Sequence, residues 1–195
     1  MKVMALFGSA RIEGNTEQLA DVALRGINHR RIHLLKCGFD PIVDERHAPN
    51  GFTAVNDGYK EVLDDFLNQD IVLFVTPLYW FGMSGQMKGF FDRWSQYMQD
   101  QKFGFHERIR GKKAYVIVVG ENPHPRIAAL PLIQQFHAIF EYTGMEFSDY
   151  IIGKGNQPGA IKQDQLALEK ADFWNKTFQQ TLCESEIGLK GPSKG

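Results

Sequence analysis

The sequence predicts an α/β protein with one doubly wound, five-stranded parallel sheet in the order 2-1-3-4-5 and helices on both of its faces. Three observations support this prediction. Short apolar runs alternate five times with helix-like patterns along the 195 residues. The apolar runs at 3–7 and 71–75 are unbroken by polar residues, which is typical of parallel strands buried on both faces. No repeat or low-complexity linker interrupts them, so we expect a single domain at 1–187 and a flexible tail at 188–195.

The amino-terminal part predicts two strand–helix units. An apolar run at 3–7 predicts the first strand, and apolar residues at helical spacing within 19–27 predict the helix after it. The second strand is expected at 31–35. Residues 38–52, which are rich in proline, glycine and polar residues, predict a loop. A second amphipathic helix is expected at 59–67.

The central part contains the most apolar strand pattern of the chain, at 71–75. We expect this strand to end at Thr76 and Pro77. A third helix is expected over 87–98, because apolar residues recur there on one helical face. Residues 100–111 predict a polar connection with a basic bias.

The carboxyl-terminal part predicts the last two strands and helices. Residues 114–119 predict the fourth strand, which Gly120 ends. Helical spacing follows within 129–140, a fifth strand is expected at 147–152, and the last helix spans 167–178.

The charge balance restricts the classes of partner. The chain has 22 basic and 23 acidic residues, a formal net charge of −1, which argues against nucleic acid or an anionic membrane as the main partner. The first apolar run is too short for a signal-peptide core and no run is long enough to span a membrane, so a cytoplasmic protein is expected. The cysteines Cys37 and Cys183 form no metal-ligand cluster, and they require no oxidising compartment.

A polar loop joins the first strand to the first helix and predicts an anion site. The loop contains Gly8, Ser9, Arg11, Gly14, Asn15 and Thr16. A helix N-terminus offers unpaired amides and a positive dipole end, and a guanidinium suits a phosphate. The loop is neither a nucleoside-triphosphate loop nor a G-x-G-x-x-G fingerprint. We expect it to bind a phosphate, and the alternative is a plain turn capped by Asn15 or Thr16.

An aromatic segment follows the third strand and predicts a site for a planar group. In a 2-1-3-4-5 sheet, ligands bind beyond the carboxyl ends of strands 1 and 3, so this segment lies beside the polar loop. Aromatic side chains in such a loop line a flat ligand or pack against a partner chain. The topology favours a planar ligand for Tyr79 and Trp80, whereas core or subunit packing is favoured for Phe81.

The two segments together resemble the NAD(P)H-dependent FMN reductase family of flavodoxin-like proteins. The similar residues are Gly8-Ser9-Ala10-Arg11, Gly14-Asn15-Thr16, Thr76-Pro77-Leu78-Tyr79-Trp80, Ser84-Gly85, Lys88 and Asp92-Arg93. The resemblance implies a tightly bound FMN, with its phosphate on the polar loop and its ring against the aromatic segment. The residues it implies for the cofactor are Ser9, Arg11, Gly14, Asn15, Thr16, Pro77, Leu78, Tyr79, Trp80, Phe81, Gly82, Gly120, Glu121 and Asn122.

The resemblance also implies an activity and an assembly. NAD(P)H would reduce the flavin, and a quinone, nitro, azo or free-flavin acceptor would then take the electrons in a ping-pong cycle. Because this chemistry belongs to the cofactor, no catalytic side chain is assigned. Family members are typically homodimers or homotetramers with the flavin near a subunit interface. The alternatives are a flavodoxin-like electron carrier, which the near-neutral charge and Arg11 disfavour, and a binding module that has lost the cofactor.

The sequence departs from some related proteins at its cysteines, and for a few other residues it leaves two interpretations open. The related iron–sulfur flavoproteins carry a compact cysteine motif after the second strand, where this chain has only Cys37. One thiolate cannot hold a cluster that needs four ligands, so no such cluster is expected and Cys37 is interpreted as a packed thiol. The basic residues at 108–113 are either a solvated face or a site for the phosphate of NADPH. His124 is either a solvated loop residue or a flavin contact.

Overall fold

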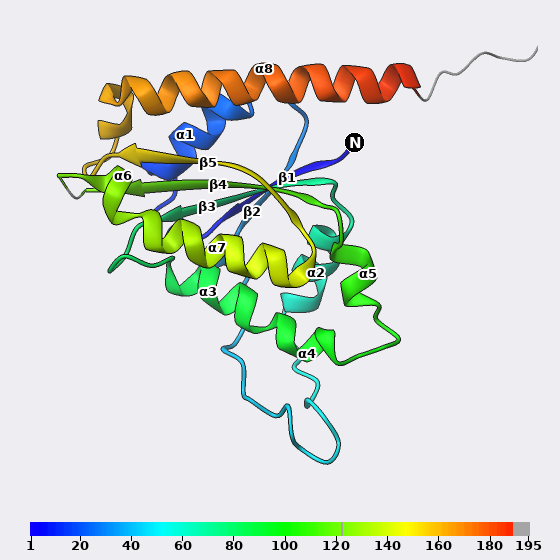
Figure 1. The fold of residues 1–195 in the computed structure, drawn as a ribbon. Helices are drawn as coiled ribbons and strands as arrows, with labels where there is room; N and C mark the ends of the chain where they lie inside the picture. Colours follow the sequence, from blue (N-terminus) through cyan, green and yellow to red (C-terminus); the bar gives the residue numbers. More distant parts are fainter. Residues whose placement is uncertain (122, 189–195) are drawn as a thin grey trace, which may run out of the picture.

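The computed structural model describes residues 1–121 and 123–188. Its centre is an all-parallel sheet in the order β2-β1-β3-β4-β5, which confirms the predicted fold class (Figure 1). The strands are β1 (Val3–Phe7), β2 (Arg30–His33), β3 (Ile71–Pro77), β4 (Lys113–Gly120) and β5 (Glu146–Lys154). Asn122 and the tail from 189 on, which carry two of the predictions, lie outside the described residues.

Helices cover both faces of the sheet (Figure 1). Helices α1 (Asn15–Ala23) and α8 (Gln165–Gly188) lie on one face. The other face carries α2 (Tyr59–Leu67), α3 (Gly85–Asp92) and α7 (Leu130–Thr143). Two apolar cores result, one on each side. Met4 and Leu6 belong to the core under α2, α3 and α7. Val3, Ala5 and Phe7 belong to the core under α1 and α8, which explains why β1 is apolar at every position.

The structure differs from the sequence prediction at the ends of several elements. Strand β2 stops at His33, and the expected end of the strand forms the short 3-10 helix η1 (Leu34–Lys36). The third helix is divided at Arg93 into α3 and α4 (Trp94–Met98). A short helix α6 (Pro125–Ala128) precedes α7, and a 3-10 helix η2 (Ala160–Gln163) precedes α8.

The stretch predicted as a polar connection contains a helix, α5 (Phe105–Ile109). Its two apolar residues are four apart and therefore lie on one helical face, where both are buried in the core under α2 and α3. The prediction was wrong because the basic residues between them dominate the composition of this stretch.

The register of the sheet decides where a ligand can bind. The last residues of the strands are aligned across the sheet, with Pro77 beside Val119 and Gly120 beside Lys154. The loops that follow β1, β3, β4 and β5 therefore leave from one edge. None of the described helices has the length and apolar composition needed to cross a bilayer.

Candidate functional site

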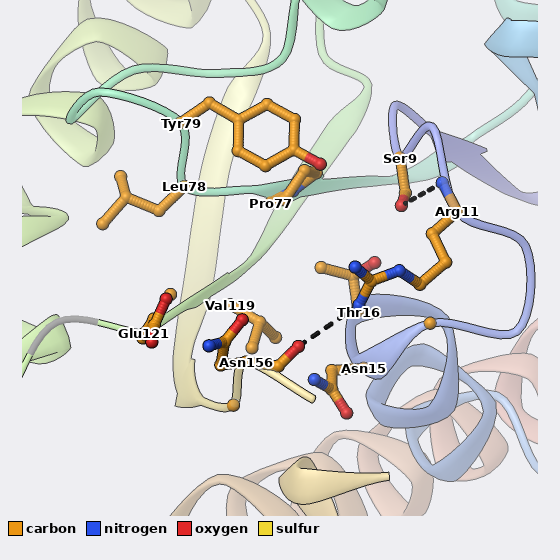
Figure 2. Close-up of a pocket in the computed structure, with 13 residues that line it drawn as sticks. Ser9, Arg11, Asn15, Thr16, Pro77, Leu78, Tyr79, Val119, Glu121 and Asn156 are labelled. Carbon is orange, nitrogen blue, oxygen red and sulfur yellow. Dashed lines mark hydrogen bonds between the residues drawn. The ribbon is translucent and has the colours of Figure 1, made fainter. Parts of the chain in front are cut away.

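A pocket of about 190 Å³ lies at the carboxyl edge of the sheet (Figure 2). It contains five of the six residues named for the polar loop, Ser9, Arg11, Gly14, Asn15 and Thr16, whereas Gly8 does not line it. Of the predicted ring site it contains Pro77, Leu78, Tyr79, Gly120 and Glu121. Three further lining residues, Val119, Gly155 and Asn156, were not predicted from the sequence.

The loop after β1 is fixed by bonds to its own side chains and to a buried carboxylate. The backbone N–H of Arg11 donates to Oγ of Ser9 at 3.0 Å. The backbone N–H of Glu13, which has a left-handed φ of 57°, donates to Oε2 of Glu17 at 2.7 Å. Glu17 is itself buried and bonded to Arg31 at 2.6 Å. The loop therefore holds a defined shape before any ligand binds.

The N-terminus of α1 opens into this pocket. Gly14 is the N-cap residue, and no side chain of the described chain caps the helix there. The first amides of α1 have no intrahelical partner, and they lie at the positive end of the helix dipole. Arg11 lines the same end of the pocket. This end has the donors and the charge that a phosphate group requires.

The loop after β5 forms a wall that the sequence analysis did not include. Nδ2 of Asn15 donates to the backbone oxygen of Gln157 at 2.9 Å, and Oδ1 of Asn15 accepts from the N–H of Ile161 at 3.3 Å. Nη1 of Arg11 donates to the backbone oxygen of Asn156 at 3.2 Å (Figure 2). Asn15 is buried, and both ends of its amide are engaged, so its side chain positions this wall rather than facing a ligand.

The signal for this wall was available in the sequence. The same rule that placed the loop after the fourth strand at the site applies to the fifth, where Gly155-Asn156 follows the strand directly. A Cβ on Gly155 would lie 2.9 Å from Nδ2 of Asn15, so only glycine allows the two loops to approach this closely. In the same way, a Cβ on Gly120 would lie 3.0 Å from Cδ2 of Leu78.

The aromatic segment forms a tight turn whose tip does not line the pocket. Tyr79 and Gly82 exchange two backbone hydrogen bonds of 3.0 and 2.9 Å. Trp80 and Phe81 between them have φ values of 48° and 63°, which is the geometry of a type I′ turn. Their side chains are 96% and 55% exposed. Tyr79 lines the pocket, whereas Trp80, Phe81 and Gly82 do not.

The basic residues at 108–113 lie far from this pocket. Lys113 begins β4, so this stretch is at the amino-terminal edge of the sheet, opposite the site. Arg108 bonds to Asp64 at 3.0 Å, and Nζ of Lys112 donates to the backbone oxygen of Gln69 at 2.5 Å. These two cations therefore have structural partners, and the structure favours the solvated-face interpretation for this stretch.

Cys37 is packed rather than presented to the site. It is half-buried, and its Sγ donates to the backbone oxygen of His33 at 3.4 Å. Burial raises the pKa of the thiol, which keeps it protonated and unreactive at neutral pH.

Comparison with known proteins agrees with this geometry. A family model described as a flavodoxin-like fold matches residues 1–177. The chain is 46% identical over 172 residues to the Bacillus subtilis protein YwqN, which is named as an NAD(P)H-dependent FMN-containing oxidoreductase; the match covers 88% of this chain and 94% of that protein. It is 28% identical to an FMN-dependent NADH:quinone oxidoreductase of Burkholderia pseudomallei, with 81% of each protein covered.

A solved structure supports the same relationship. The Trp repressor binding protein from Bacillus subtilis superimposes with a TM-score of 0.73 at 39% identity, over 88% of this chain and 96% of that one. The resemblance seen in the phosphate loop and the aromatic segment is thereby confirmed along the chain. The chain belongs to the flavodoxin-like fold family, and within it to the NAD(P)H-dependent FMN reductases.

Proposed function

We propose that this protein is an FMN-dependent NAD(P)H oxidoreductase that transfers electrons to a small-molecule acceptor. The observation that carries the proposal is the two-ended pocket. One end combines the uncapped N-terminus of α1 with Arg11, and the other has the apolar and aromatic side chains of Leu78 and Tyr79. A cofactor with a phosphate at one end and a planar ring at the other matches both ends.

The residues divide into a phosphate set and a ring set. Ser9, Arg11 and the first amides of α1 hold the phosphate, and residues 77–79 with Gly120 flank the ring. When bound, FMN would supply the redox chemistry, which is hydride acceptance from NAD(P)H and electron delivery to the acceptor in a ping-pong cycle. The protein binds and orients the reactants, so no acid–base side chain is needed. A quinone, nitro or azo compound or a free flavin is the acceptor class.

The pocket also supports a homo-oligomer. Its volume of about 190 Å³ is below the roughly 300–1,000 Å³ usual for sites that enclose such a ligand. The exposed side chains of Trp80 and Phe81 lie on the same segment that lines the pocket. A second copy of the chain packed on this turn would bury the aromatic side chains and complete the ring site.

Two measurements test the proposed function. The purified protein should bind FMN and absorb at about 450 nm, as oxidised flavin does. Stopped-flow mixing with NADPH or NADH should then bleach the bound flavin, and a quinone should restore its colour. A protein that binds FMN but is not bleached by either nucleotide is an electron carrier. A protein that is colourless after it has been mixed with saturating FMN and the free FMN has been removed is a binding module, and the proposal then fails.

A further inference from the structure

A second hollow of about 400 Å³ adjoins the flavin pocket. It shares the lining residues Glu121, Gly155 and Asn156 with that pocket, so the two hollows are neighbours. The rest of its wall is Arg126, Lys154, Ala160, Gln163 and Asp164. We call this hollow the annex. Figure 2 shows Glu121 across the pocket from Ser9 and Arg11, whereas Asn156, which also lines the annex, bonds to Arg11. The annex therefore lies along the wall that the loops after β4 and β5 form.

A buried carboxylate builds the annex. The side chain of Asp164 is 8% exposed, and its Oδ1 accepts from Nη2 of Arg126 at 2.5 Å. Its Oδ2 accepts from the backbone N–H of Lys154 at 2.7 Å. Asp164 thus joins α6 to the end of β5 and anchors one nitrogen of the Arg126 guanidinium. A guanidinium has five N–H donors, so most of them are available for a ligand.

The other polar groups of the annex suit a phosphorylated sugar. Lys154 is exposed, and among the side chains described, those of residues 1–121 and 123–185, its ammonium group has no ion-pair partner. A phosphate binds well between an ammonium and a guanidinium group. Glu121 adds a carboxylate at the boundary of the two hollows. In dinucleotide sites a carboxylate accepts from the ribose 2′-hydroxyl of NAD, whereas an arginine holds the 2′-phosphate of NADP. With the phosphate on the two cations, the 3′-hydroxyl is the ribose donor left for Glu121.

We propose that the annex binds the adenosine ribose of NADPH, with its 2′-phosphate on Lys154 and Arg126 and a ribose hydroxyl on Glu121. This inference rests on the proposed function, because the nicotinamide must reach the flavin in the adjoining pocket. It assigns a coenzyme preference, since NADH lacks the phosphate that the two cations hold. The basic residues at 108–113 lie at the opposite edge of the sheet and do not compete for this role.

Calorimetric titration of the oxidised holoprotein with NADP⁺ and NAD⁺ tests the assignment without turnover. We expect Lys154→Met and Arg126→Met each to weaken NADP⁺ binding at least about tenfold, the lower end of what a charged hydrogen bond supplies. Binding of NAD⁺ and of FMN should change less than about twofold. The matched control is Lys162→Met, because Lys162 is also exposed and near Asp164 but lines neither hollow. It should leave all three affinities unchanged.

Three results overturn the inference. NADP⁺ binding that is unchanged in both variants removes the annex from the nucleotide site, and equal losses for NADP⁺ and NAD⁺ assign it to another part of the nucleotide. Wild-type protein that binds NAD⁺ as tightly as NADP⁺ also contradicts it. Failure of the proposed function is seen separately, because the wild-type flavin is then bleached by neither nucleotide in the stopped-flow experiment.

Discussion

Gly8 shows how a single missing side chain sets the shape of the phosphate loop. A Cβ on this residue would lie 2.7 Å from Oγ of Ser84 and 2.9 Å from Cβ of Met87. Ser84 caps α3 by accepting from the N–H of Met87 at 3.2 Å, so it cannot move without uncapping the helix. The loop after β1 therefore rests directly on the start of α3, which joins the two sequence motifs.

Gly8→Ala should lower the free energy of unfolding by about 1–3 kcal/mol, because the new methyl group overpacks this contact. Urea denaturation measures the change. The control is Gly89→Ala in α3, where the nearest atom to a new Cβ is 3.8 Å away on Phe39. That substitution should raise the free energy of unfolding by about 0.5–1 kcal/mol, because alanine favours the helix. Similar changes in the free energy of unfolding for Gly8→Ala and Gly89→Ala would show that the loop after β1 shifts to accommodate the methyl group.

Arg11→Ala should weaken FMN binding by about 1.5–3 kcal/mol, the contribution of a hydrogen bond to a charged group. Arg11 also donates to the backbone of Asn156, so its loss additionally loosens the wall after β5. Fluorescence titration of the apoprotein with FMN measures the affinity. Arg46→Ala, in an ion pair on the exposed loop, is the control. Unchanged affinity for Arg11→Ala would remove this residue from the site.

At the residue scale, the residues predicted to bind the phosphate line one pocket. They could be predicted because they are close in sequence, within a single strand–loop–helix pattern. The role of Asn15 was less accessible. Its type and position suggest a cap or a phosphate ligand, whereas its partners Gln157 and Ile161 are about 140 residues away in sequence. Only the tertiary structure shows that this amide joins two loops.

At the element scale, one buried ion pair attaches the long loop between η1 and α2 to the helices. Nη1 of Arg93 donates to Oδ2 of Asp57 at 2.7 Å and to the backbone oxygen of Asp40 at 2.9 Å. The guanidinium also lies 4.4 Å from the ring centroid of Tyr59. Both charged side chains are almost fully buried. The loop extends away from the body of the protein, and this pair holds both of its ends (Figure 1).

Asp57→Asn should lower the free energy of unfolding by about 3–5 kcal/mol, because it leaves the Arg93 charge buried without its partner. Chemical denaturation at neutral pH measures the loss. Asp44→Asn is the control, since Asp44 pairs with Arg46 on an exposed part of the same loop. We expect no measurable change there. Equal stability of the two variants would show that the buried pair does not hold the loop.

The same carboxylate predicts a pH dependence. Burial opposes ionisation of Asp57, but bonds from Arg93 and from the amides of Asp40 and Tyr59 outweigh it and lower its pKa below the usual value. An unfolded aspartate titrates near about 3.9. The ion pair therefore contributes fully above that pH, and its contribution is lost as the pH falls through the lower, folded pKa. The stability difference between wild type and Asp57→Asn should shrink below about pH 4.

Element boundaries were harder to predict than the elements themselves. Helix α2 has the predicted bounds because its apolar residues all face one core. No glycine or proline marks the break between α3 and α4 at Arg93 in the sequence. The buried Arg93 side chain at this junction pairs with Asp57, which is distant in sequence and lies close only in the folded protein. Helix α5 depends on burial of Phe105 and Ile109, which a reading of composition does not register.

At the scale of the whole molecule, the sheet order followed from the sequence because parallel strands with intervening helices allow few topologies. That order alone placed the loops after β1 and β3 side by side. The shape of the aromatic turn did not follow. Trp80 and Phe81 are poor residues for left-handed backbone, where asparagine and glycine are usual, so their types do not indicate a type I′ turn.

This turn gives the whole-molecule prediction. Replacing Trp80 by Asn and Phe81 by Gly together should raise the free energy of unfolding of the monomer by about 1–3 kcal/mol, since the strain of left-handed backbone is relieved. The same double variant should lose self-association, because it removes the exposed aromatic side chains that a second copy would cover.

Denaturation at several protein concentrations separates the change in monomer stability from the change in self-association, and sedimentation velocity measures the assembly. Phe173→Ser, on the exposed side of α8, is the control and should keep the assembly of the wild type. A double variant that still assembles would show that the aromatic turn is not the subunit contact. One that is no more stable would show that the left-handed backbone at Trp80 and Phe81 carries no strain.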